Sequence, residues 1–369
     1  MMITVIDQTI REGMQYQGVV FSLDQRMKIL AFQEQLGVDV CQAGYPSAHP
    51  QEAGMVRHMA DHAAKNGYRI RVAALGRAFM QDADTLLNTG IHDVHLHLHI
   101  KNSATRAEVE KTCTGLGIVV DHIRTTRPDA VICVAMLDMG RTGPALFDTC
   151  IRFLCRDLKI DMLSLPDTSG IMAPNQVAER IKKAVCHAED TAVSIHCHND
   201  FGMASANTIM GIVAGARALE VSALGIGERN GIGDLYTVAK LLADQGISCR
   251  FDHENMAAIT AYYAFVDAIV KEQTGQGLIS PPTPVFGQAV HTHVAGTHAD
   301  GAFGISSTPN FHLNLLCGRR MVQKYLTLHT IAFNPARLDN ITRAIKNASM
   351  QKCRRLEKTE IQEIAASSN

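Results

Sequence analysis

Eight short runs of apolar and β-branched residues alternate with longer amphipathic stretches between residue 3 and about residue 245. The short runs predict strands, and the stretches between them are long enough for crossover helices. Eight such units in regular order favour a closed parallel barrel over an open sheet. The sequence therefore predicts an α/β fold, a (β/α)₈ TIM barrel. The predicted strands are ITVID (3–7), VDVCQ (38–42), IRVAAL (70–75), VHLHLHI (94–100), AVICVAM (130–136), DMLSL (161–165), AVSIH (192–196) and EVSAL (220–224).

The periodicity changes after about residue 246. Residues 275–287 (GQGLISPPTPVFG) are rich in glycine and proline and predict a linker, and helical patterns follow to about residue 363. A chain of 369 residues has room for a barrel of roughly 250 residues and an appendage. We therefore predict a catalytic barrel over 1–275, followed by a linker and a small, mostly helical C-terminal subdomain over 276–369.

The charge balance excludes some partners. Lys and Arg (35) nearly cancel Asp and Glu (36), so no basic field attracts the chain to nucleic acid or to an anionic membrane. No run of eighteen apolar residues occurs, and the first residues do not resemble a secretory leader, so we expect a cytoplasmic protein. The ten cysteines form no CxxC pair, and we expect reduced thiols.

Polar residues follow several of the predicted strands, where barrel enzymes carry their catalytic groups. His196 and His198 are two residues apart at the end of the seventh strand, so their side chains point to one side of a regular strand. With the Glu12 carboxylate after the first strand, they would form a facial metal site with open positions. Arg11 would then lie beside the ion, where it can stabilise charge that develops on a substrate oxygen.

Two other interpretations of these histidines stay open. One of the pair could cap a helix while the other fills space, since histidine is a common hydrogen-bonding residue. His95, His97 and His99 also alternate along one predicted strand and offer a second inward-facing trio. No carboxylate accompanies this trio.

Three segments together resemble the family of metal-dependent barrel enzymes that includes isopropylmalate synthase, homocitrate synthase, citramalate synthase and HMG-CoA lyase. The motifs are D-x-T-x-R-[DE]-G-x-Q at 7–15, H-x-H-N-D-x-G at 196–202 and G-x-G-E-R at 225–229. Shorter matches are G-[YF]-P at 44–46 and D-T-x-G at 167–170. The resemblance covers essentially the whole chain.

The resemblance implies a divalent metal ion (Mg, Mn, Zn or Co) held by Glu12, His196 and His198. It implies that Arg11 binds the carbonyl region of a 2-oxo acid and that Thr168 contacts the substrate carboxylate. The residues that we assign to substrate binding are Gln15, Gln42, Arg77 and Thr168.

The C-terminal part carries H-x-x-G-x-H-x-D-G at 293–301, a pattern of the condensing members. The resemblance implies that His298 takes part in removing a proton from the acetyl-CoA methyl group. It also implies a homodimer, in which this subdomain is a lid over the partner's barrel and His298 acts in the partner's site. The alternative interpretation is a solvated polar turn.

Some positions depart from the family pattern. The strand-five glutamate of condensing relatives is Leu137, and Asp138, which we assign to catalysis, is the nearby carboxylate that remains. A frequent glutamate before the G-[YF]-P turn is Gln42, so the pocket is less negative than usual. An asparagine ligand of the lyase-type relatives is Ile232, which favours a synthase.

The resemblance therefore implies a Claisen-type condensation of acetyl-CoA with a 2-oxo acid, releasing CoA, as in homocitrate synthase or isopropylmalate synthase. One alternative is a lyase or aldolase that cleaves a carbon–carbon bond. Another is a catalytically degraded relative that binds a metal and a ligand for regulation, which only Leu137 supports.

Overall fold

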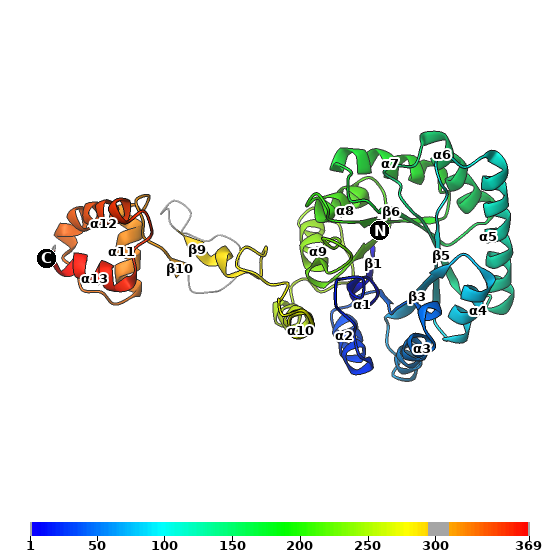
Figure 1. The fold of residues 1–369 in the computed structure, drawn as a ribbon, viewed down its shortest axis with the longest axis horizontal. Helices are drawn as coiled ribbons and strands as arrows, with labels where there is room; N and C mark the ends of the chain where they lie inside the picture. The colour runs from blue at the N-terminus through cyan, green and yellow to red at the C-terminus, as the bar shows by residue number, and fades with distance from the viewer. Residues whose placement is uncertain (1, 294–309, 368–369) are drawn as a thin grey trace. The chain divides into compact units, whose positions relative to one another are not determined.

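The computed structural model describes residues 2–293 and 310–367, and its strands close into a parallel barrel (Figure 1). Each strand pairs with the next in chain order, and β1 pairs with β8 to complete the ring. The predicted (β/α)₈ fold is confirmed. The strands are β1 (Thr4–Asp7), β2 (Val40–Gln42), β3 (Arg71–Arg77), β4 (Asp93–Leu98), β5 (Val131–Met136), β6 (Met162–Asp167), β7 (Ala192–Cys197) and β8 (Ala218–Val221).

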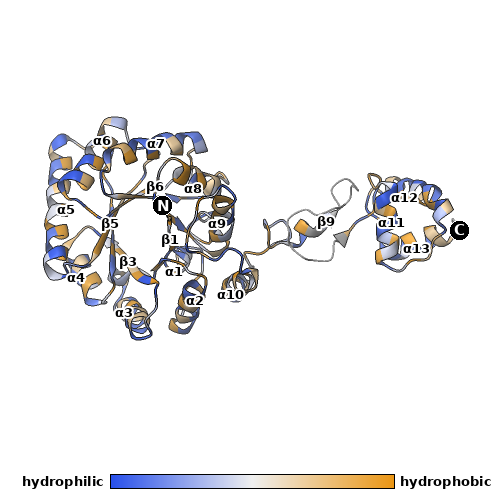
Figure 2. Cartoon of the chain, turned by 180° about the vertical axis from the view of Figure 1, so that it is seen from behind, coloured by the Kyte–Doolittle hydropathy of each residue, from blue (hydrophilic) through white to orange (hydrophobic). Residues whose placement is uncertain are grey.

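Helices surround this ring and cover the outer face of the strands (Figure 1). They carry both hydrophobic and hydrophilic residues, as expected of helices that pack one face on a sheet (Figure 2). The helices of this part are α1 (Thr9–Gly13), α2 (Leu23–Gln35), α3 (Pro50–Lys65), α4 (Met80–Asn88), α5 (Arg106–Thr126), α6 (Pro144–Arg152), α7 (Pro174–His187), α8 (Ala204–Val213), α9 (Leu235–Ala243) and α10 (Met256–Thr274).

Apolar side chains from six strands meet in one buried cluster of the barrel. The cluster comprises Ile6, Val40, Ala73, Cys133, Met162 and Ala218. A packed interior of this kind makes the barrel a rigid support, so that polar side chains farther along the strands are held at one end.

The predicted eighth strand, 220–224, is displaced from the observed one by two or three residues. The chain leaves the ladder at Ser222, whose backbone N–H donates to the carbonyl of Gly233. Leu224 and Gly225 then adopt left-handed conformations, with φ of 56° and 65°, in the 3₁₀ turn Ala223–Gly225. The apolar residues after Val221 therefore form a turn above the strand.

The chain divides into two compact units between Leu278 and Ile279, whereas we placed the boundary between 275 and 276. The second unit contains α11 (Arg319–Leu328), α12 (Leu338–Lys352) and α13 (Lys358–Ser367). These helices share a core of their own, which includes Leu313, Met321 and Ile345. Short strands β9 (Thr292–His293) and β10 (Asn310–Phe311) pair in parallel. Within the described residues, no helix has the length and apolar character needed to cross a membrane.

Candidate active site

The first motif forms a turn at the carboxyl end of β1, held by two buried side chains. The Asp7 carboxylate accepts hydrogen bonds from the backbone N–H of Thr9 at 2.8 Å and from its hydroxyl at 2.6 Å. The Thr9 hydroxyl accepts in turn from the backbone N–H of Ala223, 2.8 Å away, just after β8. This turn fixes where α1 begins, and Arg11 and Glu12 on α1 line a pocket in the barrel.

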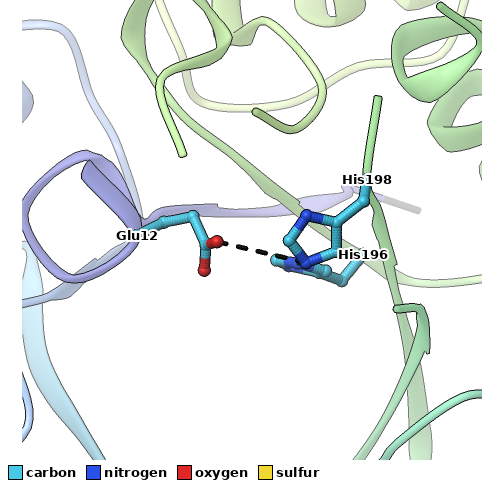
Figure 3. A group of neighbouring side chains, drawn as sticks. All are labelled: Glu12, His196 and His198. Carbon is cyan, nitrogen blue, oxygen red and sulfur yellow. Dashed lines mark hydrogen bonds and ion pairs between the residues drawn. The ribbon is translucent and has the colours of Figure 1, made fainter. Parts of the chain in front are cut away.

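Glu12, His196 and His198 point toward one another from α1 and from the end of β7 (Figure 3). Nε2 of His196 lies 3.3 Å from Nε2 of His198, which lies 4.0 Å from Oε1 of Glu12. No side chain of the three is more than 6% exposed. Their potential ligand atoms all lie within 4.8 Å of one another. The sequence-predicted trio is thus brought together in space.

This donor set fits a divalent metal ion. One carboxylate oxygen and two imidazole nitrogens are common ligands of transition metals. Two nitrogens that are each about 2.1 Å from a zinc ion lie roughly 3.4 Å apart at the tetrahedral angle. The histidine nitrogens lie 3.3 Å apart. Burial is the main cause that lowers the pKa of His198 to about 3, so its ring is neutral and can donate a lone pair.

The third motif supplies space for Glu12. A Cβ atom on Gly227 would lie 2.7 Å from Cγ of Glu12, so only glycine admits the carboxylate without a shift. Gly231 has a φ of 82°, and a Cβ there would lie 1.9 Å from the carbonyl oxygen of Gly225. The backbone N–H of Glu228 donates to Oε1 of Glu12 at 3.3 Å. The glycines of this segment therefore fold it tightly around the proposed ligand.

Arg11 lies beside Glu12 and is surrounded by amide oxygens. Its Nε donates to Oε1 of Gln42 at 2.5 Å. Its two Nη atoms donate to Oε1 of Gln15 and to Oε1 of Gln8, each at 2.7 Å, and it also forms an ion pair with Glu12. Because a guanidinium has only donors, each glutamine must turn its carbonyl oxygen toward Arg11.

That requirement also settles the protonation of a neighbouring histidine. With its Oε1 toward Arg11, Gln42 donates through Nε2 to Nδ1 of His95, 2.7 Å away. Burial lowers the pKa of His95, so the neutral ring carries its proton on Nε2. His95 lines the pocket, and its Nε2 is a hydrogen-bond donor there.

The alternating histidines of β4 do not form a second metal site among the described residues. His95 and His97 both line the pocket, and Nε2 of His97 lies 3.2 Å from the Tyr45 hydroxyl. His99 is exposed and follows the end of the strand. The two inward histidines thus add polar imidazole groups to the pocket lining, and His95 is linked to Arg11 through Gln42.

A pocket of about 580 Å³ contains all of these groups. Its lining combines polar side chains with apolar residues of β3, β5 and β6, among them Leu75, Ala135 and Pro166. The lining residues are Gln8, Arg11, Glu12, Met14, Gln15, Gln42, Tyr45, Ala48, His49, Glu52, Leu75, His95, His97, Cys133, Ala135, Leu137, Ser164, Pro166, Thr168, His196, His198, Glu220 and Glu228.

Gln15, Gln42 and Thr168, which the sequence assigns to substrate binding, all belong to this lining. Arg77 does not; its side chain is 51% exposed and forms an ion pair with Asp82 at 2.8 Å. The structure therefore holds Arg77 on a neighbouring acid and outside the pocket wall.

Asp138 is likewise absent from this lining. Its backbone N–H donates to the Thr168 hydroxyl at 2.9 Å, and its carboxylate accepts from Arg141 at 2.7 Å. Leu137 lines the pocket at the position of the family's glutamate. His298 lies outside the described residues.

Two buried polar residues were not anticipated from the sequence, Gln8 and Glu220. The Glu220 carboxylate accepts hydrogen bonds from Nε2 of Gln8 at 2.6 Å and from the Ser194 hydroxyl at 2.8 Å. Burial acts to raise the pKa of Glu220, but its contacts, chiefly with His196, lower it to about 2. A charged residue inside the predicted run EVSAL was the available signal, because barrel interiors are mostly apolar.

Comparisons with known proteins show the family of the chain. The HMGL-like family model matches residues 2–262. The chain is 31% identical over 316 residues to the 2-isopropylmalate synthase of Sulfolobus acidocaldarius, covering 81% of this chain and 75% of that protein. It is 30% identical to a probable 2-isopropylmalate synthase of Methanosarcina acetivorans. That match covers 83% of this chain but only 57% of the other protein. It is 30% identical to the homocitrate synthase of Pyrococcus abyssi, with 84% of this chain and 81% of that protein covered.

Solved structures share the barrel at lower identity. The HMG-CoA lyase of Brucella melitensis has a TM-score of 0.60 at 17% identity, covering 73% of this chain and 98% of that chain. At this identity the likeness concerns the fold alone.

Proposed function

Because this chain belongs to the HMGL-like family, we propose that it condenses acetyl-CoA with a 2-oxo acid and releases free CoA. The family that the three motifs predict is confirmed. The observation that carries the proposal is the convergence of Glu12, His196 and His198 beside Arg11 in one pocket. Relatives named 2-isopropylmalate synthase and homocitrate synthase support the condensing reaction.

Glu12, His196 and His198 would hold the divalent ion, which supplies Lewis-acid polarisation of a substrate carbonyl when bound. The donor set accommodates zinc, cobalt, manganese or magnesium, with two imidazoles favouring the transition metals. Arg11 donates hydrogen bonds to the oxygen atoms of the 2-oxo acid. Its three glutamine partners fix the plane of the guanidinium before substrate arrives.

The reaction joins the acetyl methyl carbon to the carbonyl carbon of the 2-oxo acid. A base removes one methyl proton, the resulting enolate forms the new carbon–carbon bond, and the carbonyl oxygen gains a proton as it becomes a hydroxyl. Water then cleaves the thioester, which gives a carboxylate and the CoA thiol. Arg11 is placed to stabilise the oxygen as its negative charge grows. We assign the base role to His298, as a prediction from the sequence motif.

Thr168 and Gln15 would contact the substrate carboxylate, since both line the pocket and offer hydrogen-bonding groups. Asp138 would act on the reaction through Thr168, because the Thr168 hydroxyl accepts a hydrogen bond from the backbone N–H of Asp138. Arg77 would bind substrate only after leaving Asp82. We further propose the homodimer with the second unit as a lid; the cytoplasmic location stays a prediction from the sequence.

The runner-up function is carbon–carbon cleavage. The fold neighbours include HMG-CoA lyases, but only the fold is shared at 15–17% identity. The segment from Gly225 to Asp234 contains no cysteine, and Ile232 offers no ligand atom next to His198, with which it forms a β-bridge. Both features favour the synthase.

The direct test is thiol release from acetyl-CoA in the presence of a panel of 2-oxo acids, with metal-replete protein. We expect one or more acids to release CoA in amounts equal to the new hydroxy acid, detected by mass spectrometry. A protein with a full complement of metal that releases no thiol with any of them would contradict the condensation. Cleavage of a 3-hydroxyacyl-CoA in its place would establish the lyase.

A further inference from the structure

Glu220 is a buried carboxylate that lies inside the barrel beside the proposed metal ligands. It is 5% exposed, and the parallel register of β7 and β8 pairs it directly with His196. Its two oxygen atoms contact three residues from two strands, namely Gln8 at the end of β1 and Ser194 and His196 on β7. A carboxylate without water needs partners of this kind to remain charged.

The first contact concerns the tautomer of a ligand. Oε2 of Glu220 lies 3.3 Å from Nδ1 of His196, an ion-pair distance although not a hydrogen bond in its geometry. A lone pair on Nδ1 would face the lone pairs of the carboxylate, so the neutral ring carries its proton on Nδ1. The lone pair of His196 is then on Nε2, the atom that faces His198.

The second contact reaches Arg11 through an amide. Gln8 is completely buried, donates from Nε2 to Glu220 at 2.6 Å and accepts at Oε1 from Arg11 at 2.7 Å. An ionised carboxylate only accepts and a guanidinium only donates, so the amide of Gln8 has one permitted orientation. If the amide turned over, both of its contacts would be lost.

We propose that Glu220 is a positioning residue that sets two functional groups at once: the Nε2 lone pair of His196 and, through Gln8, the orientation of Arg11. Neither effect requires Glu220 to touch substrate. One buried charge thus links the metal-binding residues of the site to Arg11, which stabilises the substrate oxygen. Such outer-shell carboxylates typically change metal affinity by 10–100-fold when they are removed.

The first experiment measures Mn²⁺ binding without substrate, from the loss of the free-ion electron paramagnetic resonance signal. We expect Glu220→Gln to raise the Mn²⁺ dissociation constant about 10–100-fold. Glu220→Asp keeps the charge and should restore part of the affinity. The matched control is Asp93→Asn on β4, where a carboxylate 1% exposed pairs with Arg71 outside the pocket lining. This control should bind Mn²⁺ like the wild type.

Wild-type affinity in Glu220→Gln would overturn the proposal, as would weaker binding by the aspartate variant than by the glutamine variant. Should the glutamine variant fail to fold, Glu220→Asp carries the test, because a carboxylate withdrawn by one methylene still predicts measurably weaker binding. An aspartate variant with unchanged affinity would then overturn the proposal.

The second experiment isolates the Arg11 branch with Gln8→Leu. Leucine can neither accept from Arg11 nor donate to Glu220, while the contact of Glu220 with His196 stays in place. We expect the Mn²⁺ affinity to be kept and kcat to fall by about tenfold or more, the scale of one misoriented transition-state donor. An unchanged kcat, or a loss of Mn²⁺ affinity as large as that of Glu220→Gln, would overturn the two-branch arrangement.

The kcat measurement on Gln8→Leu rests on the proposed condensation, whereas the Mn²⁺ binding experiment does not. If the wild-type protein turned over no 2-oxo acid, the proposed function would be contradicted. The Mn²⁺ comparison would still decide the role of Glu220 toward His196.

Discussion

Gly227→Ala tests whether the glycine-rich segment after β8 exists to admit Glu12. The added methyl carbon would lie 2.7 Å from Cγ and 3.3 Å from Oε1 of Glu12. Ordinary contact between these atoms begins near 3.4 Å, so Cγ must move by about 0.7 Å. Glu12 is 1% exposed and forms an ion pair with Arg11, so its displacement also disturbs that group.

Misplacement of a reacting group by about 1 Å costs on the order of 10²-fold in rate, and we expect kcat to fall by about that factor. Overpacking of a filled site costs about 1–3 kcal/mol, so the variant should still fold. The assays are metal content per chain after desalting, by elemental analysis, and kcat from thiol release. A thermal melt of the same samples separates loss of the site from loss of the barrel.

Gly54→Ala is the matched control, because a Cβ at this position in α3 would meet no atom within 4 Å. Alanine in a helix interior should stabilise the protein by about 0.5–1 kcal/mol and leave metal content and kcat unchanged. If Gly227→Ala retained wild-type metal content and kcat, the steric explanation of the G-x-G-E-R motif would be refuted.

The other predictions concern single residues. His198→Ala should lose bound metal and activity while the barrel folds, because residues at strand ends serve function more than stability; elemental analysis showing equal metal in variant and wild type would contradict the ligand set. Arg11→Lys should lower kcat by on the order of 10²-fold, since an ammonium cannot reproduce the hydrogen bonds of a planar guanidinium to several oxygens. A kcat close to that of the wild type in steady-state kinetics would mean that Arg11 contributes only its positive charge. Mixed Glu12→Ala and His298→Ala subunits should recover roughly a quarter of wild-type activity on random pairing of a two-fold dimer; proven exchange without recovery would exclude action across the dimer. Iodoacetamide should label exposed Cys186 and Cys353 but not Cys150, whose pKa burial raises to about 12; mass-spectrometric labelling of Cys150 in the folded protein would be inconsistent with that burial.

Much of the site could be predicted because its motifs record local backbone requirements. Asp7 and Thr9 build the turn that starts α1, and Gly227 makes room for Glu12. These backbone requirements are met by residues within a few positions of each strand end, so they appear in the sequence as short motifs. The two-residue spacing of His196 and His198 likewise translates directly into side chains on one face.

Contacts between distant strands were harder to anticipate. Gln8 and Glu220 are 212 positions apart, and only the pairing of β1 with β8 brings them together. The end of β8 was misplaced because the apolar residues after Val221 are compatible with a strand as well as with a turn. Leu224 has a positive φ, which the sequence does not indicate because the residue is not glycine. Arg77 was assigned to substrate binding, yet Asp82, five residues later, binds its side chain.

The proposed ligands come from the two ends of the ring. Glu12 follows the first strand, and the histidines lie on the seventh, so β8 and its pairing with β1 separate them in the sheet. A nascent chain that has not yet produced β7 carries one ligand of the three and cannot complete the set. Capture of the ion therefore waits for closure of the ring, and a ligand that binds only the native state stabilises that state by mass action. On this arrangement an ion held by the three ligands would join the region where the first and last strands meet, so metal supply would affect the stability of the folded protein as well as its turnover.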